Sequence, residues 1–151
     1  MAEEGAAPRD PLAPAEAYRA ILLVEDDTTL AGLLAHHLEG RGYLVDAVAS
    51  AEEASGYIRS GVTPWLVLLD INLPGESGWA LLRHGPLAGP DAPPVVVMSA
   101  VPVSPARLRE FQVAGYLPKP FPIEALMDCV ERLDNPAEGD GPSTVPEGID
   151  A

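Results

Sequence analysis

Acidic side chains and the only lysine in this chain of 151 residues stand where they could do chemistry together. Four residues share one property, a position directly after an apolar run: Glu25, Asp26, Asp70 and Lys119. Parallel strands of an open α/β sheet bring their carboxyl ends to one edge, where ligands bind. Carboxylates gathered there repel each other unless a cation compensates them, and Mg²⁺ prefers such oxygen ligands. We therefore expect Glu25 and Asp26 to hold Mg²⁺ beside Asp70, with Lys119 as a counter-charge for a phosphoryl group.

Asp70 is the candidate nucleophile of this site. A carboxylate can attack phosphorus to form an aspartyl phosphate, and a nearby cation reduces the repulsion between the two anions. Pro74 and Gly78 fit a tight loop that would keep this carboxylate at the rim of the sheet. Asp27 has a simpler interpretation as the cap of the helix that follows it, with Thr28 at the start of that helix.

Polar residues near two further strand ends complete the candidate site. Ser99 ends the fourth apolar run, and its hydroxyl group could bond a phosphoryl oxygen, while the small Ala100 lets its backbone N–H approach. Serine is also a common turn residue, and Tyr116 could be an ordinary aromatic residue of an edge strand. The Lys119-Pro120 bond is a candidate cis peptide, because X–Pro bonds tolerate that isomer in tight turns.

Five apolar runs alternate with five helical patterns between about residues 19 and 133. The expected strands share apolar, partly β-branched composition and lie at 20–24, 43–48, 65–69, 94–98 and 116–117. The first helix is predicted from a stripe with the spacing of one helical face, formed by Leu30, Leu33, Leu34, His37 and Leu38. Starts of later helices are marked by Ser50 with Glu53, Ser77, Pro105 and Pro122. This alternation predicts an α/β fold, a doubly wound five-stranded parallel sheet with helices on both faces.

The formal net charge of −14 is concentrated in part at the two ends of the chain. We predict disordered tails at 1–18 and 134–151, around a folded domain at 19–133, because both ends lack apolar periodicity and are rich in acid. The negative charge disfavours nucleic acid as a partner, since duplex binding requires Lys and Arg. No apolar stretch is long enough for a membrane span and no signal segment is evident, so we expect a cytoplasmic protein. Cys129 fits a buried thiol, and the three histidines fit ordinary helix residues.

Taken in order, the motifs Val-Glu-Asp-Asp, Asp-x-x-x-Pro-x-x-x-Gly, Met-Ser-Ala and Tyr-Leu-x-Lys-Pro-Phe closely resemble the receiver domain of two-component response regulators. The resemblance covers about residues 19–133 and implies the flavodoxin-like strand order 2-1-3-4-5, for which a member of this family is a known example. It also implies a phosphoprotein that accepts a phosphoryl group from a histidine kinase or a histidine phosphotransfer protein. Such a domain is no enzyme beyond its own phosphorylation and dephosphorylation.

The same resemblance implies a role for each candidate residue. Asp70 would be the phospho-acceptor, and Mg²⁺ would be bound by Asp26, by Glu25 partly through water, and by the backbone carbonyl of Asn72. Oxygens of the phosphoryl group would be held by Ser99, Ala100 and Lys119. Ser99 would move toward the phosphate and Tyr116 would turn inward, which in this family remodels the face formed by the fourth helix, fifth strand and fifth helix.

Three departures from the family pattern stand out. The segment between Ser99 and Lys119 is about two residues shorter than usual, the third helix is short, and the residues after 133 are too few for an output module. We therefore expect a stand-alone receiver, a monomer or weak dimer that acts through protein contacts. Two alternatives are a phosphorylation-independent adaptor of the same fold and a phosphohydrolase. The phosphohydrolase lacks support, because such enzymes place a second acid where Asn72 stands.

Overall fold

The computed structural model describes residues 19–135, and the two tails predicted to be disordered lie outside these residues apart from 134 and 135. Five strands alternate with five helices. The strands are β1 (Ala20–Val24), β2 (Leu44–Val48), β3 (Leu66–Asp70), β4 (Val95–Ser99) and β5 (Gly115–Pro118). The helices are α1 (Thr28–Glu39), α2 (Ala51–Arg59), α3 (Gly78–His84), α4 (Pro105–Glu110) and α5 (Ile123–Asp134).

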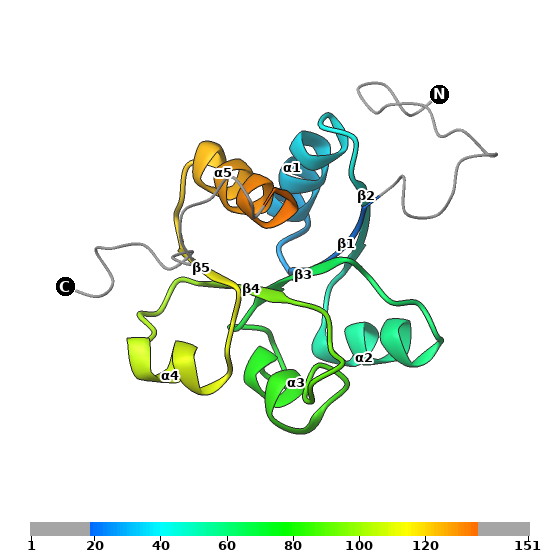
Figure 1. The fold of residues 1–151 in the computed structure, drawn as a ribbon, viewed down its shortest axis with the longest axis vertical. Coiled ribbons are helices and arrows are strands. Elements are labelled where there is room, and N and C mark those ends of the chain that lie inside the picture. The colour runs from blue at the N-terminus through cyan, green and yellow to red at the C-terminus, as the bar shows by residue number, and fades with distance from the viewer. Residues whose placement is uncertain (1–18, 136–151) are drawn as a thin grey trace.

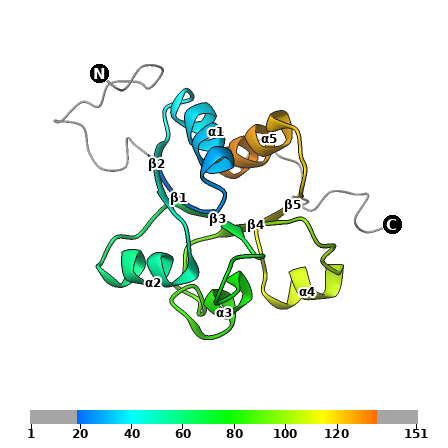
Figure 2. The ribbon, with the colours of Figure 1, turned by 180° about the vertical axis from the view of Figure 1, so that it is seen from behind.

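The strands form one parallel sheet in the order β2-β1-β3-β4-β5, which confirms the predicted fold class and strand order. Helices α1 and α5 cover one face, and α2, α3 and α4 cover the other (Figure 1). The view from behind shows the same three layers (Figure 2). Because all strands run the same way, the carboxyl ends of β1, β3, β4 and β5 share one edge.

Burial explains why the central strands have uninterrupted apolar sequences. Every residue of β3 and β4 is buried, since both faces of these strands are covered by helices. Edge strand β2 instead has no fully buried residue, and Asp46 is exposed as its sequence pattern predicts. Two apolar cores result, one on each face of the sheet. Each is formed by buried side chains of the strands and of the helices that cover that face.

Side-chain caps set the starts of four helices. Asp27 accepts hydrogen bonds from the backbone N–H groups of Thr29 and Leu30, which confirms its interpretation as a cap. The hydroxyl groups of Ser50, Ser77 and Ser104 accept equivalent bonds at the starts of α2, α3 and α4. These four capped turns follow the ends of β1, β2, β3 and β4 and help to build the edge at which the candidate residues lie.

The apolar stripe that predicts α1 is only partly buried. Leu34 and Leu38 are buried together with Ala31, but Leu33 is 50% exposed and His37 is exposed. The physical reason is that α1 covers the sheet with a narrow face, so residues at the margin of the apolar stripe turn toward solvent. Within residues 19–135, no helix is both long and apolar enough to cross a membrane.

Candidate functional site at the carboxyl edge of the sheet

Three carboxylates from two strand ends gather as the sequence predicts. Carboxylate oxygens of Glu25, Asp26 and Asp70 lie within 4.8 Å of one another. Glu25 and Asp70 are each only 2% exposed, whereas Asp26 faces solvent. Strand pairing explains the cluster, because β1 and β3 are neighbours in register and their ends emerge together. Two buried acids and one exposed acid thus form a concentrated negative centre.

Lys119 reaches this centre from the end of β5. Its Nζ donates to Glu25 Oε1 at 2.7 Å and to Asp70 Oδ2 at 3.1 Å. Burial alone would lower the pKa of Lys119, but these hydrogen bonds and the two negative charges raise the pKa above its ordinary value. Burial raises the pKa of Glu25, and the hydrogen bond from Lys119 opposes that rise. Lys119 is therefore a firmly protonated cation shared by two carboxylates.

Backbone groups hold both buried carboxylates in place. Asn72 N–H donates to Asp70 Oδ1 at 2.9 Å, and Asp27 N–H donates to Glu25 Oε2 at 3.1 Å. Helix α3 begins against the backbone of Asp70: a Cβ at Gly78 would lie 2.8 Å from the Asp70 carbonyl oxygen. Gly78 is needed because any side chain would meet rigid backbone there. The nucleophile candidate is fixed by its own loop on one side and by Lys119 on the other.

The Ser99 hydroxyl is buried and turned toward the loops around it. Its Oγ lies 2.8 Å from Asn72 Oδ1 and 2.7 Å from the Val101 carbonyl oxygen, and it accepts from Val101 N–H at 3.0 Å. One hydroxyl hydrogen cannot serve both oxygens. Every group is satisfied when the Asn72 side-chain NH₂ donates to Ser99 Oγ and the hydroxyl donates to the Val101 carbonyl oxygen. Ser99 thus links the loop after Asp70 to the loop after β4.

The remaining predicted residues occupy the surroundings of this centre. Ala100 is exposed directly after Ser99, and the Lys119-Pro120 bond is cis, as the sequence indicates. Tyr116 is 2% exposed and packs in the core between the sheet and the α2–α4 layer, so it already lies inward. Among residues 19–135, the Tyr116 hydroxyl makes no hydrogen bond to the carboxylates.

The chemistry of the donor set fits a hard divalent cation. All three side chains offer carboxylate oxygens, which suit Mg²⁺ or Ca²⁺ rather than metals that prefer nitrogen or sulfur ligands. The net charge of the site also favours a bound cation, because three carboxylates are balanced by only one ammonium group. The exposed position of Asp26 also leaves an open side for water, which Mg²⁺ retains in most protein sites.

Sequence reasoning missed a second group of residues beside the site. Trp79 and Phe111 stack with their ring centroids 5.3 Å apart, and the guanidinium groups of Arg107 and Arg83 lie over Trp79 and Phe111 respectively. We refer to these four residues as the aromatic–arginine cluster. The signal was an aromatic residue and an arginine four positions apart in both α3 and the α4 region, a spacing that places two side chains on one helical face.

Comparison with known proteins gives a consistent answer. Residues 21–131 match the model of the response regulator receiver domain family. The regulatory protein VanRB of Enterococcus faecalis is 35% identical over 115 residues, which cover 75% of this chain and 51% of that protein. PfeR, a transcriptional activator protein of Pseudomonas aeruginosa, is 39% identical over 109 residues, which cover 70% of this chain and 34% of that protein. The chain thus spans about half or less of these curated relatives.

Solved structures agree at the level of the fold and the family. The non-phosphorylated HemR receiver domain of Leptospira biflexa is 31% identical, with a TM-score of 0.69 over 78% of this chain and 94% of that one. A response regulator of Burkholderia pseudomallei, solved with a phosphorylated aspartic acid and a calcium ion, is 25% identical, with a TM-score of 0.63 over 80% and 71% of the two chains. With the five-stranded parallel sheet and the acid–lysine edge, these matches establish that the chain belongs to the response regulator receiver family of two-component systems.

Proposed function

We propose that Asp70 accepts a phosphoryl group from a histidine kinase or a histidine phosphotransfer protein, and that the chain passes the signal on through protein contacts. In this reaction a carboxylate oxygen of Asp70 bonds to phosphorus while the bond from phosphorus to the donor nitrogen breaks, and the electron pair leaves with that nitrogen. The observation that carries the proposal is the position of Asp70: a buried carboxylate at a strand end, between Lys119 and two further acids.

Mg²⁺ is the cofactor that this site suits. The carboxylates of Asp26 and Glu25 would hold the ion together with the backbone carbonyl of Asn72, and a bound cation offsets charge on the transferring oxygens. Lys119 already neutralises part of the negative centre and is placed to donate to a phosphoryl oxygen in place of its bond to Asp70. Ser99 and the Ala100 N–H would hold the remaining oxygens.

The switch follows from the bonds of Ser99. A phosphoryl group on Asp70 offers strong acceptor oxygens, for which the Ser99 hydroxyl would leave Val101 and Asn72. The loop between β4 and α4 would then rearrange. Tyr116 would stabilise the rearranged state from the core, where it is already buried.

The test is phosphorylation by a small phosphodonor in the presence of Mg²⁺, followed by measurement of intact mass. We expect the wild-type chain to gain the mass of one phosphoryl group and Asp70→Asn to gain none. Asp91→Asn is the matched control, since Asp91 is an exposed acid in the loop before β4. An equal mass gain in Asp70→Asn would overturn the assignment of the acceptor.

Metal binding can be tested separately by thermal unfolding. A ligand that binds only the folded state stabilises it, by about 2.7 kcal/mol at a concentration one hundred times its Kd. We expect excess Mg²⁺ to raise the Tm of the wild type and of Asp27→Asn, which retains a capping side chain. Asp26→Asn should lose most of the rise, and an unchanged rise in this variant would remove Asp26 from the metal site.

A phosphorylation-independent adaptor is the second candidate, and the short α4 helix favours it. This helix has six residues, and the aromatic–arginine cluster holds it against α3, which would oppose a rearrangement. The two candidates differ in one outcome. An adaptor binds its partner equally well in the wild type and in Asp70→Asn, with and without the phosphodonor, whereas a switch does not.

A further inference from the structure

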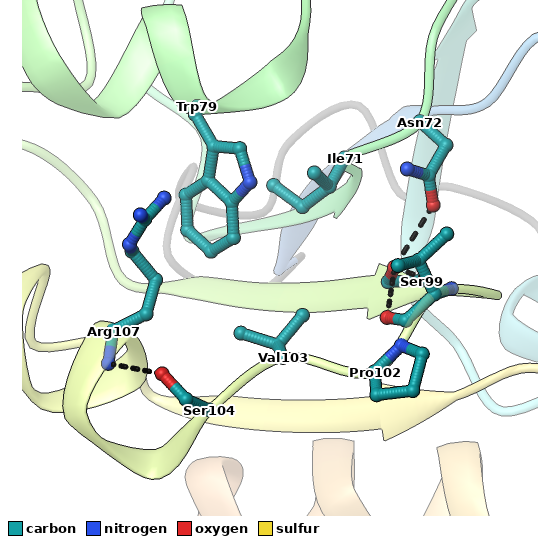
Figure 3. A pocket seen from close by; sticks show the side chains of 9 residues that line it. Ile71, Asn72, Trp79, Ser99, Pro102, Val103, Ser104 and Arg107 are labelled. Carbon is teal, nitrogen blue, oxygen red and sulfur yellow. Dashed lines mark hydrogen bonds between the residues drawn. The ribbon is translucent and has the colours of Figure 1, made fainter.

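A pocket of about 340 Å³ opens between α3 and the loop that leads into α4. Its walls are apolar, with Trp79 and Ile71 on one side and Val103 and Pro102 on the other (Figure 3). Polar groups stand at its two ends, Asn72 with Ser99 at one and Arg107 with Ser104 at the other. Apolar walls with a few polar groups in a cavity of this size are typical of ligand sites.

The surface of the pocket has features of a protein-binding site. Val101, which contributes to the lining, is 56% exposed and is one of three large apolar side chains with high exposure among residues 19–135. Trp and Arg are the residue types most enriched at binding hot spots. Arg107 retains 41% exposure of its side chain, and its bond to Glu110 is long at 3.5 Å, so its guanidinium group can accept a further anionic partner.

Charge separates this region from the rest of the described chain. Residues 78–113 contain three arginines and two acids, whereas the remainder of residues 19–135 contains thirteen acids and five basic residues. The helices that border the pocket thus belong to the least acidic stretch of the described chain, and Arg107 at one end of the pocket offers a positive charge to an approaching carboxylate. Complementary potentials of this kind orient a partner and select its charge.

We propose that the α3–α4 pocket is the docking site for a segment of a partner protein that presents an apolar side chain next to a carboxylate. The apolar side chain enters between Trp79 and Val103, and the carboxylate pairs with Arg107. This inference rests on the proposed function in one respect, because the pocket is the surface through which the state of Asp70 is read.

Ser99 provides the connection between the two sites. It lines the pocket and is bonded to Asn72 and Val101, which also line it. A displacement of the Ser99 hydroxyl toward Asp70 releases both partners and changes the shape of this end of the pocket. Affinity for the docked segment therefore differs between phosphorylated and unphosphorylated chains.

The probe is a blocked pentapeptide, Ala-Glu-Leu-Glu-Ala, titrated against the full chain. Binding is followed by the fluorescence of Trp79 in a Trp65→Phe background, because the chain has two tryptophans. We expect a Kd on the order of 1 mM, which is reasonable for a short peptide that buries a single side chain. The peptides Ala-Lys-Leu-Lys-Ala and Ala-Glu-Ala-Glu-Ala should bind about tenfold more weakly, since each lacks one of the two required features.

A charge reversal gives the decisive comparison. Arg107→Glu should weaken binding of the acidic peptide by about tenfold and improve binding of the lysine peptide, because the sign of the contact is inverted. Arg109→Glu is the matched control, as Arg109 is an exposed arginine of the same helix that does not line the pocket. Equal effects of the two substitutions, or no binding of any peptide to the wild type, would overturn the proposal.

Two other occupants are distinguished by the same measurement. If the acidic end of this chain fills the pocket, replacing Glu138, Asp140, Glu147 and Asp150 by amides will tighten binding of the acidic peptide. If a second copy fills it, sedimentation will show a dimer that Arg107→Glu dissociates. Either result overturns the proposal of a partner segment.

Phosphorylation is measured by intact mass in the same samples, so the two proposals can fail independently. A phosphorylated chain whose peptide affinity changes by about threefold or more supports both. Normal phosphorylation without any change in affinity rejects the link through Ser99 and leaves the proposed function standing. Peptide binding that follows the charge pattern in a chain that cannot be phosphorylated rejects the proposed function instead.

Discussion

The two helical layers of this domain are held to the sheet by different means. On one face, α1 and α5 have 12 residues each and bury apolar side chains along their length against the sheet, and the turn after α1 adds polar contacts to α5, with Arg41 paired to Glu131 and the Tyr43 hydroxyl donating to Asp134 at 2.9 Å. On the other face, α3 and α4 have 7 and 6 residues and are joined by the stacked rings and guanidinium groups of the aromatic–arginine cluster.

Under the proposed function, this difference predicts where a change at Asp70 is transmitted. Long helices with continuous buried faces resist rearrangement, because many contacts must be lost together. A helix of six residues has few such contacts, and its leading loop depends on the bonds of Ser99. Under the proposed function, we therefore expect the α1–α5 layer to stay fixed as the frame of the domain and the α3–α4 layer to respond, provided that the contacts of the aromatic–arginine cluster are lost on phosphorylation.

The largest expected effect tests the frame. Leu126 of α5 is fully buried, and Leu126→Ala should lower the free energy of unfolding by about 3 kcal/mol through lost burial and an unfilled cavity. Leu33→Ala is the control, because Leu33 is 50% exposed and should change stability by less than about 0.5 kcal/mol. Urea denaturation measures both, and similar losses would contradict the burial pattern of this layer.

The next effect concerns the junction between Asp70 and α3. Gly78→Ala should lower the free energy of unfolding by roughly 2 kcal/mol, since its Cβ would lie 2.8 Å from the Asp70 carbonyl oxygen and 3.0 Å from Ile71 Cα. Gly32→Ala in α1 should instead stabilise by about 0.5–1 kcal/mol, because nothing lies within 4 Å of its added Cβ and alanine favours helix. Thermal unfolding compares the two, and opposite signs are the required result.

A smaller effect separates the two layers directly. Trp79→Leu removes the stack on Phe111 and the contact with Arg107, at a cost of about 1 kcal/mol. Hydrogen exchange should become faster in α4 while α1 and α5 keep their protection. Uniform loss of protection across all helices would mean that the α3–α4 layer is no more adjustable than the frame.

The smallest effect is expected at the surface of the frame. Arg41→Gln breaks the ion pair with Glu131, whose two side chains are 53% and 43% exposed. Exposed pairs contribute little, so the free energy of unfolding should fall by no more than about 0.5 kcal/mol. A loss above 1 kcal/mol in denaturant titration would show that polar ties, rather than apolar burial, hold α1 to α5.

Much of the site was predictable because it depends on strand ends. The carboxyl ends of β1, β3 and β5 share one edge in any parallel sheet with this order, and the structure brings Glu25, Asp70 and Lys119 together there as expected. Local signals were equally reliable for the Asp27 cap and the cis Lys119-Pro120 bond. The exposure of Leu33 and His37 in α1 was not predicted, because the spacing of apolar residues does not indicate how wide a face of the helix the sheet covers.

By itself, the sequence determined the order of elements, the parallel sheet, and the acids and lysine at its edge. Apolar periodicity is a local signal for each element, and the common direction of the strands brings their carboxyl ends to one edge. Only the tertiary structure decided which groups the Ser99 hydroxyl contacts. It also decided that aromatic and arginine side chains of α3 pack against those of the α4 region. It also decided that a pocket remains between these helices. Such features depend on the distance and angle between short helices, and these are settled only when loops and side chains pack together.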